Sequence, residues 1–136
     1  MRNFPAPGEH WGTVAITADV DGENVYVLID YIKASHYHWR DESHVLIYAE
    51  HREGKQLYLL RDRTQDYEII DRNFFKADGH CSYSPDRERI LYDSYPFDQY
   101  RHLYIYNLAD RKCSDLASFY SDQVSTGDIR CDLHPR

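Results

Sequence analysis

The feature that most constrains the fold of this chain is an internal repeat with a spacing of 44 residues. Residues 36–39 (HYHW) align with residues 80–83 (HCSY), and residues 46–48 (LIY) align with residues 90–92 (ILY) at the same spacing and without a gap. A fixed period of about 40 to 50 residues is typical of proteins in which each repeat forms one supersecondary unit. The chain therefore contains at least two copies of such a unit.

Each copy is expected to form four antiparallel strands. Short runs rich in Val, Ile, Leu and Tyr alternate with turn residues, and no long stretch keeps a helical period. Asp21-Gly22 and Glu53-Gly54 are typical of hairpin turns, and Ser84-Pro85-Asp86 is typical of a type I turn. The expected strands are 35–39, 45–50, 56–61 and 67–70 in the first copy and 80–84, 90–94, 102–107 and 114–118 in the second.

This pattern predicts an all-β fold, and more specifically a partial β-propeller of about two and a half four-stranded antiparallel blades. Residues 13–29 are expected to form the outer hairpin of a preceding blade. Residues 35–70 and 80–118 would be two complete blades, and residues 131–136 the start of the next, all within one domain spanning 1–136. Closed propellers have typically about 4 to 8 blades. We therefore expect the chain to self-associate, or to lack blades that a longer parent protein would supply.

Composition and charge argue against several classes of partner. The formal net charge is −7, whereas nucleic-acid-binding proteins usually carry clustered Lys and Arg, so no nucleic acid is expected. No apolar run approaches the roughly 18 residues needed to span a bilayer, and the first ten residues lack the apolar stretch of a secretory signal. Cys81, Cys113 and Cys131 show no CxxC spacing, which favours reduced thiols over a disulfide framework or a structural zinc site. We expect no membrane association and a cytoplasmic location.

Three histidines occupy corresponding positions at the start of successive units. His36 and His80 are matched by the repeat, and His134 follows His80 by 54 residues in a third, incomplete copy. The first strand of each propeller blade lines the central channel, so the three imidazoles are expected to meet at one channel mouth. Such a group can bind a divalent metal of the Zn, Mn, Fe or Ni type. The same position can also hold neighbouring loops through hydrogen bonds, and both roles stay open.

Further polar residues are expected near this group. His38 lies on the same side of its strand as His36, and Arg136 takes the matching position in the third copy, so both could reach an anionic ligand. The loop at residues 95–102 includes Tyr100 and Arg101 and could form part of a site for a sugar acid. Loops of this composition are also common on solvated surfaces, and that alternative stays open.

Several longer motifs carry a resemblance to a known family. They are residues 78–86 (DGHCSYSPD), 92–96 (YDSYP), 101–104 (RHLY) and 127–136 (GDIRCDLHPR). Together they resemble bacterial propellers grouped with the oligogalacturonate lyases, within the wider class of TolB-like and WD40-like repeats. The likeness covers roughly residues 35–136.

The resemblance implies a lyase of pectin breakdown that cleaves uronate oligosaccharides by β-elimination, with a divalent metal, usually manganese, in the channel. It implies that His80 and His134 are metal ligands. The ligands near the C-terminus of that family follow a Gln-x-x-His-x-His pattern, whereas the corresponding positions here hold Cys131, His134 and Arg136.

If this chemistry operates, His36 or His38 is expected to be the catalytic base. Arg136, through its bidentate guanidinium group, would bind the substrate carboxylate together with Arg101 and Tyr100. The alternative function is a non-catalytic propeller module that binds a protein or a carbohydrate.

Overall fold

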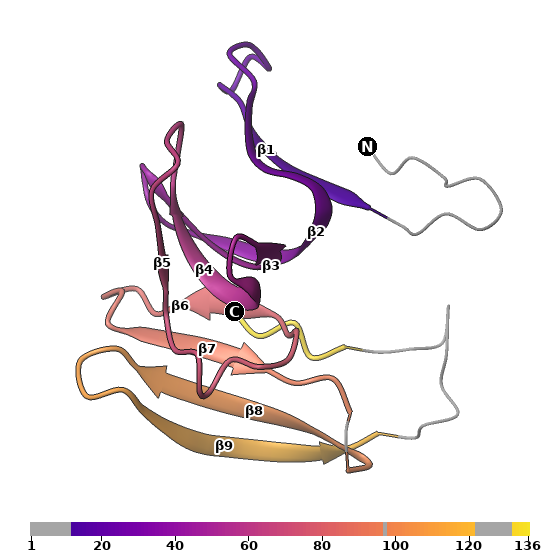
Figure 1. Ribbon diagram of the computed structural model, residues 1–136. Coiled ribbons are helices and arrows are strands. Elements are labelled where there is room, and N and C mark those ends of the chain that lie inside the picture. The colour runs from indigo at the N-terminus through magenta and orange to yellow at the C-terminus, as the bar shows by residue number, and fades with distance from the viewer. Residues whose placement is uncertain (1–11, 97, 122–131) are drawn as a thin grey trace, which may run out of the picture.

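A computed structural model describes residues 12–96, 98–121 and 132–136, and Figure 1 shows two β-sheets lying one above the other. The described residues contain nine strands and no helix. The prediction of an all-β fold is therefore confirmed. Of the residues singled out from the sequence, Cys131 lies outside the described part of the chain.

The first sheet contains five strands, each antiparallel to the next. Its third and fourth strands are buried along most of their length, which explains their continuous apolar runs at residues 45–49 and 57–60. Gly54, with a φ of 81°, ends the tight turn between them. In order, the strands are β1 (Thr13–Thr17), β2 (Tyr26–Asp41), β3 (His44–His51), β4 (Gly54–Arg61) and β5 (Tyr67–Ile69).

The second sheet is a meander of four antiparallel strands. The first connection is the turn that the sequence predicts, because the Arg87 amide donates to the Ser84 carbonyl at 2.8 Å and the Ser84 hydroxyl bonds the Asp86 carboxylate. In order, the strands are β6 (Cys81–Tyr83), β7 (Arg89–Asp93), β8 (Tyr100–Asn107) and β9 (Lys112–Tyr120).

Strand β2 is longer than the sequence indicates. The sequence predicts a strand at 35–39 that is separate from the hairpin at 13–29, whereas one strand continues through both regions. Its first half pairs with β1 and its second half with β3, and the register shifts between Ala34 and Tyr37. A bulge of this kind bends a strand and lets it change partners. The hairpin is consequently continuous with the first sheet.

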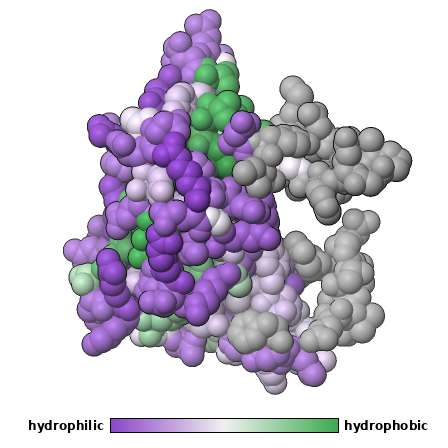
Figure 2. All heavy atoms as spheres, in the orientation of Figure 1, coloured by the Kyte–Doolittle hydropathy of each residue, from purple (hydrophilic) through white to green (hydrophobic). Residues whose placement is uncertain are grey.

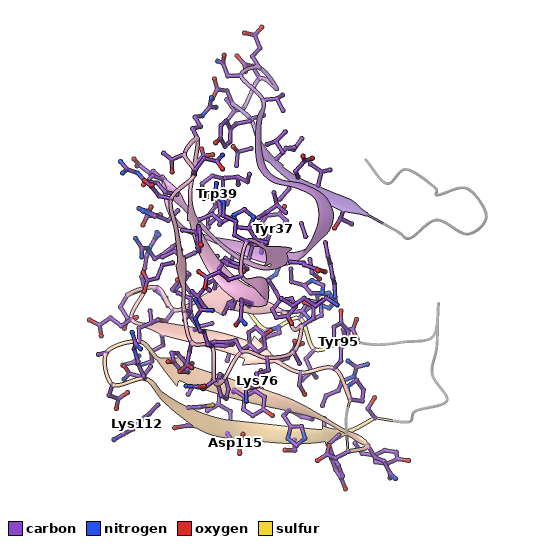
Figure 3. The ribbon with its side chains drawn as sticks, viewed as in Figure 1. Tyr37, Trp39, Lys76, Tyr95, Lys112 and Asp115 are labelled. Atoms are coloured by element: carbon purple, nitrogen blue, oxygen red, sulfur yellow. The ribbon has the colours of Figure 1, made fainter. Side chains whose placement is uncertain are left out.

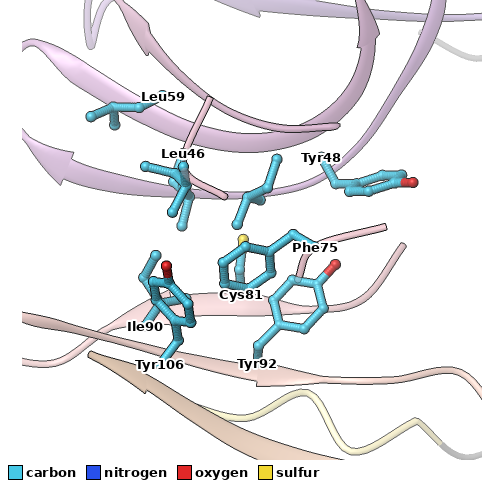
Figure 4. Packing of buried hydrophobic residues seen from close by; sticks show 10 residues of the cluster. Leu46, Tyr48, Leu59, Phe75, Cys81, Ile90, Tyr92 and Tyr106 are labelled. Carbon is cyan, nitrogen blue, oxygen red and sulfur yellow. The ribbon is translucent and has the colours of Figure 1, made fainter. Parts of the chain in front are cut away.

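The main core lies between the two sheets, as Figure 4 shows. Leu46 and Tyr48 from the first sheet face Ile90 and Tyr92 from the second, and Phe75 from the connecting segment fills the space between them. Phe75 is 1% exposed, and its ring lies edge-on to that of Tyr92 at 4.9 Å between centroids. Full burial of one such side chain is worth about 1.5–3 kcal/mol, so this contact fixes the position of one sheet against the other.

Strand pairing shifts one part of the repeat by a residue. Tyr37 of β2 pairs with Ile47 of β3, and Cys81 of β6 pairs with Tyr92 of β7. The spacing is therefore 44 residues between β2 and β6 but 45 residues between β3 and β7. The alignment of residues 46–48 with 90–92 at 44 is therefore wrong by one residue. The reason is that the connection between the first two strands is one residue longer in the second sheet.

The shifted register shows that equivalent faces of the two sheets point in the same direction, so the front of one sheet packs on the back of the other. The Tyr92 side of the second sheet packs against the first sheet, whereas the equivalent Ile47 side of the first sheet faces away from the second. We call the latter the outer face. Tyr37 and Trp39 lie on it 65% and 41% exposed, and Figure 3 labels both.

The outer face of the first sheet is apolar and hollow. It contains a cavity of about 380 Å³ that the β1–β2 hairpin covers in part. Figure 2 shows hydrophobic residues gathered along this hairpin, where Val14, Ile16 and Val27 are exposed. The first sheet covers the equivalent face of the second sheet, but among the described residues no sheet covers the outer face of the first.

Candidate metal and ligand site

A cavity of about 560 Å³ lies where β2, β6 and the C-terminal segment meet, and it is lined by residues 35–39, 80–83 and 134–136. These are the three stretches that the sequence places at corresponding positions of successive units. Direct contacts join them, since the Ser82 hydroxyl donates to the Pro135 carbonyl at 3.1 Å and the Cys81 thiol lies 3.9 Å from the His36 carbonyl. The structure thus brings together segments almost 100 residues apart in the sequence.

The three predicted histidines converge in this cavity. The ring centroids of His36 and His80 are 3.8 Å apart, and those of His80 and His134 are 3.7 Å apart. His36 and His134 are separated by 6.4 Å, so His80 lies between them. His80 is the central residue of the group.

His80 is held by a buried carboxylate. Both oxygens of Asp93 lie within hydrogen-bonding distance of the His80 Nδ1, at 2.9 and 3.0 Å, and the His80 backbone amide donates to the same carboxylate at 2.6 Å. His80 is 7% exposed, and its Nε2 has no hydrogen-bond partner among the described residues. A proton held on Nδ1 by Asp93 leaves a lone pair on Nε2, which is the arrangement of a metal-bound histidine.

Gly79 makes this arrangement possible. A Cβ atom at this position would lie 2.1 Å from the Asp93 carbonyl oxygen and 2.7 Å from the Tyr92 ring. Only glycine lets the chain pass so close to the end of β7. The glycine before His80 therefore sets the distance between His80 and Asp93.

A carboxylate completes the group in a way that the sequence analysis missed. Potential ligand atoms of His80, Asp132 and His134 all lie within 4.8 Å of one another. A set of two imidazoles and one carboxylate suits Mn, Fe or Zn. The signal was the spacing of Asp132 and His134, two residues apart in the C-terminal motif, which places a carboxylate next to a histidine.

His36 and His38 differ in their surroundings. The His36 Nε2 lies 2.9 Å from the hydroxyl of Tyr95, which extends from the loop after β7 (Figure 3). Burial and the neighbouring His80 lower the pKa of His36, and the carboxylates of Asp78 and Asp93 oppose this only in part. His38 lines the cavity, and its Nδ1 accepts a long hydrogen bond of 3.5 Å from the Tyr83 amide.

The three residues expected to bind substrate lie in different places. Arg136 lines the cavity. Arg101 is 5% exposed and forms an ion pair of 2.7 Å with Asp132, so its charge is already matched by a carboxylate. Tyr100 is not a lining residue of the cavity, and its ring lies 6.0 Å from that of Tyr120 at the far edge of the second sheet.

In comparisons with protein-family models, with curated proteins and with solved structures, nothing matched the chain. Within the described ranges, no helix has the length and apolarity needed to cross a membrane.

Proposed function

We propose that this chain is a section of a β-propeller that binds a divalent metal, manganese by expectation, through His80, His134 and Asp132. We further propose that the site takes the carboxylate of a uronate oligosaccharide and cleaves the sugar chain by β-elimination, as the resemblance to oligogalacturonate lyases implies. The observation that carries the proposal is the buried Nε2 of His80, which lacks a hydrogen-bond partner among the described residues and lies beside two further ligand groups.

The stacking of the sheets supports the propeller part of the proposal. Successive blades of a propeller pack front to back, and the two sheets are related in this sense because Ile47 and Tyr92 hold equivalent positions but only Tyr92 faces the other sheet. Strands β2 and β6 lie next to each other and supply lining residues to one cavity. The apolar outer face of the first sheet is where a preceding blade would pack.

The donor set supports the metal. A buried polar nitrogen without a partner costs about 1–3 kcal/mol, and coordination to a cation would remove this cost. Asp93 orients the His80 ring through Nδ1 in the way that carboxylates support histidine ligands at known metal centres. A bound divalent cation would supply positive charge to neutralise the uronate carboxylate and stabilise the charge that develops on it.

The reaction requires a base beside the metal site. A base takes the proton from the carbon next to the carboxylate, the electron pair forms a carbon–carbon double bond, the bond to the leaving oxygen breaks, and that oxygen gains a proton from solvent. His36 is the better candidate, because its lowered pKa keeps it neutral near pH 7. His38 is the weaker candidate, because the Tyr83 amide donates to its Nδ1, whereas the Tyr95 hydroxyl beside the His36 Nε2 can either donate or accept. Arg136 would hold the carboxylate.

Manganese titration of the chelator-treated chain tests the metal site. We expect one site per chain by calorimetry and electron paramagnetic resonance, with affinity lost in His80→Ala. His44→Ala is the matched control, because the His44 ring bonds Asp41 and Ser43 outside the cavity. Equal binding by the wild type and His80→Ala would refute the site.

Turnover of digalacturonate tests the reaction. The product carries a new conjugated double bond, so we expect ultraviolet absorbance to rise with manganese and to stay flat after chelation. His36→Ala should abolish the rise while retaining manganese binding. A rate in His36→Ala equal to that of the wild type would exclude His36 as the base.

A non-catalytic sugar-binding module is the second candidate. It is favoured by the position of Arg101 and Tyr100, since only Arg136 of the three expected substrate residues lines the cavity. Digalacturonate binding that persists in chelator, without product formation, would support this alternative over the lyase.

A further inference from the structure

Two charged residues of the second sheet contact the proposed metal ligands. Asp93 at the end of β7 bonds His80, and Arg101 near the start of β8 pairs with Asp132. The side chains of Arg101 and Asp132 are each 6% exposed. Among the described residues, no other ion pair of a lysine or arginine has both side chains so deeply buried. An unpaired charge at the position of Arg101 or Asp132 would be strongly disfavoured, so each side chain holds the other in place.

The backbone around His134 shows why such fixing is needed. His134 has a φ of 47°, in the left-handed region that non-glycine residues seldom adopt. A conformation of this kind persists only when the surrounding structure holds it. Here the contacts lie on both sides, with Asp132 paired to Arg101 before His134 and Pro135 bonded to Ser82 after it. The two contacts attach the segment that carries His134 to the second sheet.

We propose that Arg101 is a positioning residue of the metal site, which holds the Asp132 carboxylate and the adjoining His134 beside His80. This inference rests on the metal site proposed above and assigns Arg101 a role other than direct binding of substrate. Arg101 acts through Asp132, because their 2.7 Å ion pair sets where the carboxylate lies relative to the two histidines. Residues that orient metal ligands in this way typically contribute about 10- to 100-fold to metal affinity.

Manganese affinity of four variants of the full chain tests this role. Arg101→Met should weaken binding by about 10- to 100-fold. Arg101→Lys keeps the charge without the planar fork and should recover part of the loss. Asp132→Asn should weaken binding on its own. The double variant Arg101→Met/Asp132→Asn should bind no more weakly than Asp132→Asn, because residues that act through one contact are not additive.

Tyr106→Phe is the matched control. Tyr106 lies on the same strand as Arg101 and donates to Asp71 at 2.7 Å, outside the cavity, so its loss should lower stability without changing manganese affinity. Visible absorption of the cobalt-loaded chain adds a readout of ligand geometry. The spectrum should change in Arg101→Met and stay unchanged in Tyr106→Phe. Denaturant unfolding of each variant checks that it is folded, and the double variant avoids an unpaired buried charge if Arg101→Met does not fold.

The outcomes separate this inference from the metal site itself. If Arg101→Met binds manganese as tightly as Tyr106→Phe or more tightly, while His80→Ala does not bind it, the role of Arg101 is overturned and the metal site stands. Additive losses in the double variant also overturn it. Absence of manganese binding by the wild type overturns both proposals.

Discussion

His36, within β2, and His80, directly before β6, occupy corresponding positions in the two sheets, yet their surroundings differ. His80 is buried and bonded through Nδ1 to Asp93 of its own sheet, whereas His36 reaches across to the Tyr95 hydroxyl of the other sheet. Strand pairing assigns the position of Asp93 in the second sheet to Tyr48 in the first. Tyr48 packs into the core between the sheets and bonds a backbone carbonyl, so it offers His36 no carboxylate.

The difference shows how one repeated fold can give one histidine a carboxylate partner and the other a hydroxyl partner. The repeat places the two histidines at corresponding positions and therefore brings both rings to one cavity. The residue at the shared position of Asp93 and Tyr48 then decides whether the histidine has a carboxylate partner for its Nδ1. Substitutions around these positions should separate the role of the scaffold from that of the site.

Gly79→Ala should have the largest effect on stability. The added Cβ would lie 2.1 Å from a backbone oxygen, so β7 and the chain before β6 must move apart. We expect a loss of about 3 kcal/mol in the free energy of unfolding, measured with urea, which is the upper range for overpacking. Gly54→Ala is the control, because no atom lies within 4 Å of its added Cβ and only its positive φ opposes the change, at a cost of about 1 kcal/mol. Equal losses in the two variants would contradict the close approach.

Asp93→Asn should remove the carboxylate that accepts a hydrogen bond from the His80 Nδ1. The asparagine amide would donate to Nδ1, which moves the imidazole proton to Nε2 and removes the lone pair proposed for the metal. We expect a loss of about 1.5–3 kcal/mol in stability, because the lost bonds involve a charged acceptor, and manganese binding about 10- to 100-fold weaker. Nitrogen-15 spectra of the histidine rings check the tautomer. A proton that remains on Nδ1 would contradict the role of Asp93.

The sequence could predict the strands because their apolar runs and turn residues are local signals. It could also predict that His36, His80 and His134 meet, since the repeat places them at corresponding positions. The roles of Asp93 and Arg101 could not be predicted, because each depends on a contact between segments far apart in the sequence. The one-residue shift between the sheets could not be predicted either, because the length of a turn changes the strand register without changing the residue pattern.

Tyr106→Phe should lower stability in a way that depends on pH. Burial alone would raise the pKa of Asp71, but the Tyr106 hydroxyl and the amides of Asn73 and Phe74 outweigh it and lower this pKa. A carboxyl with a lowered folded-state pKa stabilises the fold above its unfolded pKa, and the contribution is lost as pH falls through the folded value. We expect a loss of about 1 kcal/mol at neutral pH that shrinks under acid.

The control for Tyr106→Phe is Tyr92→Phe, because the Tyr92 hydroxyl donates to the neutral Ala77 carbonyl at 2.7 Å. Its effect on the free energy of unfolding should not vary with acid pH. Parallel pH profiles for the two variants would show that Asp71 does not contribute in the way described.

His36→Asn should have the smallest effect, and it tests the histidine that lacks a carboxylate partner. The folded-state pKa of His36 lies below its ordinary value of 6.5, so the unfolded chain binds a proton more readily in the window just below that value. The free energy of unfolding should therefore decrease as pH falls through this window, and the decrease should be shallower in His36→Asn. The slope of urea midpoint against pH measures the difference. An identical slope in the two proteins would contradict the lowered pKa of His36 and the choice of His36 as a base that is neutral near pH 7.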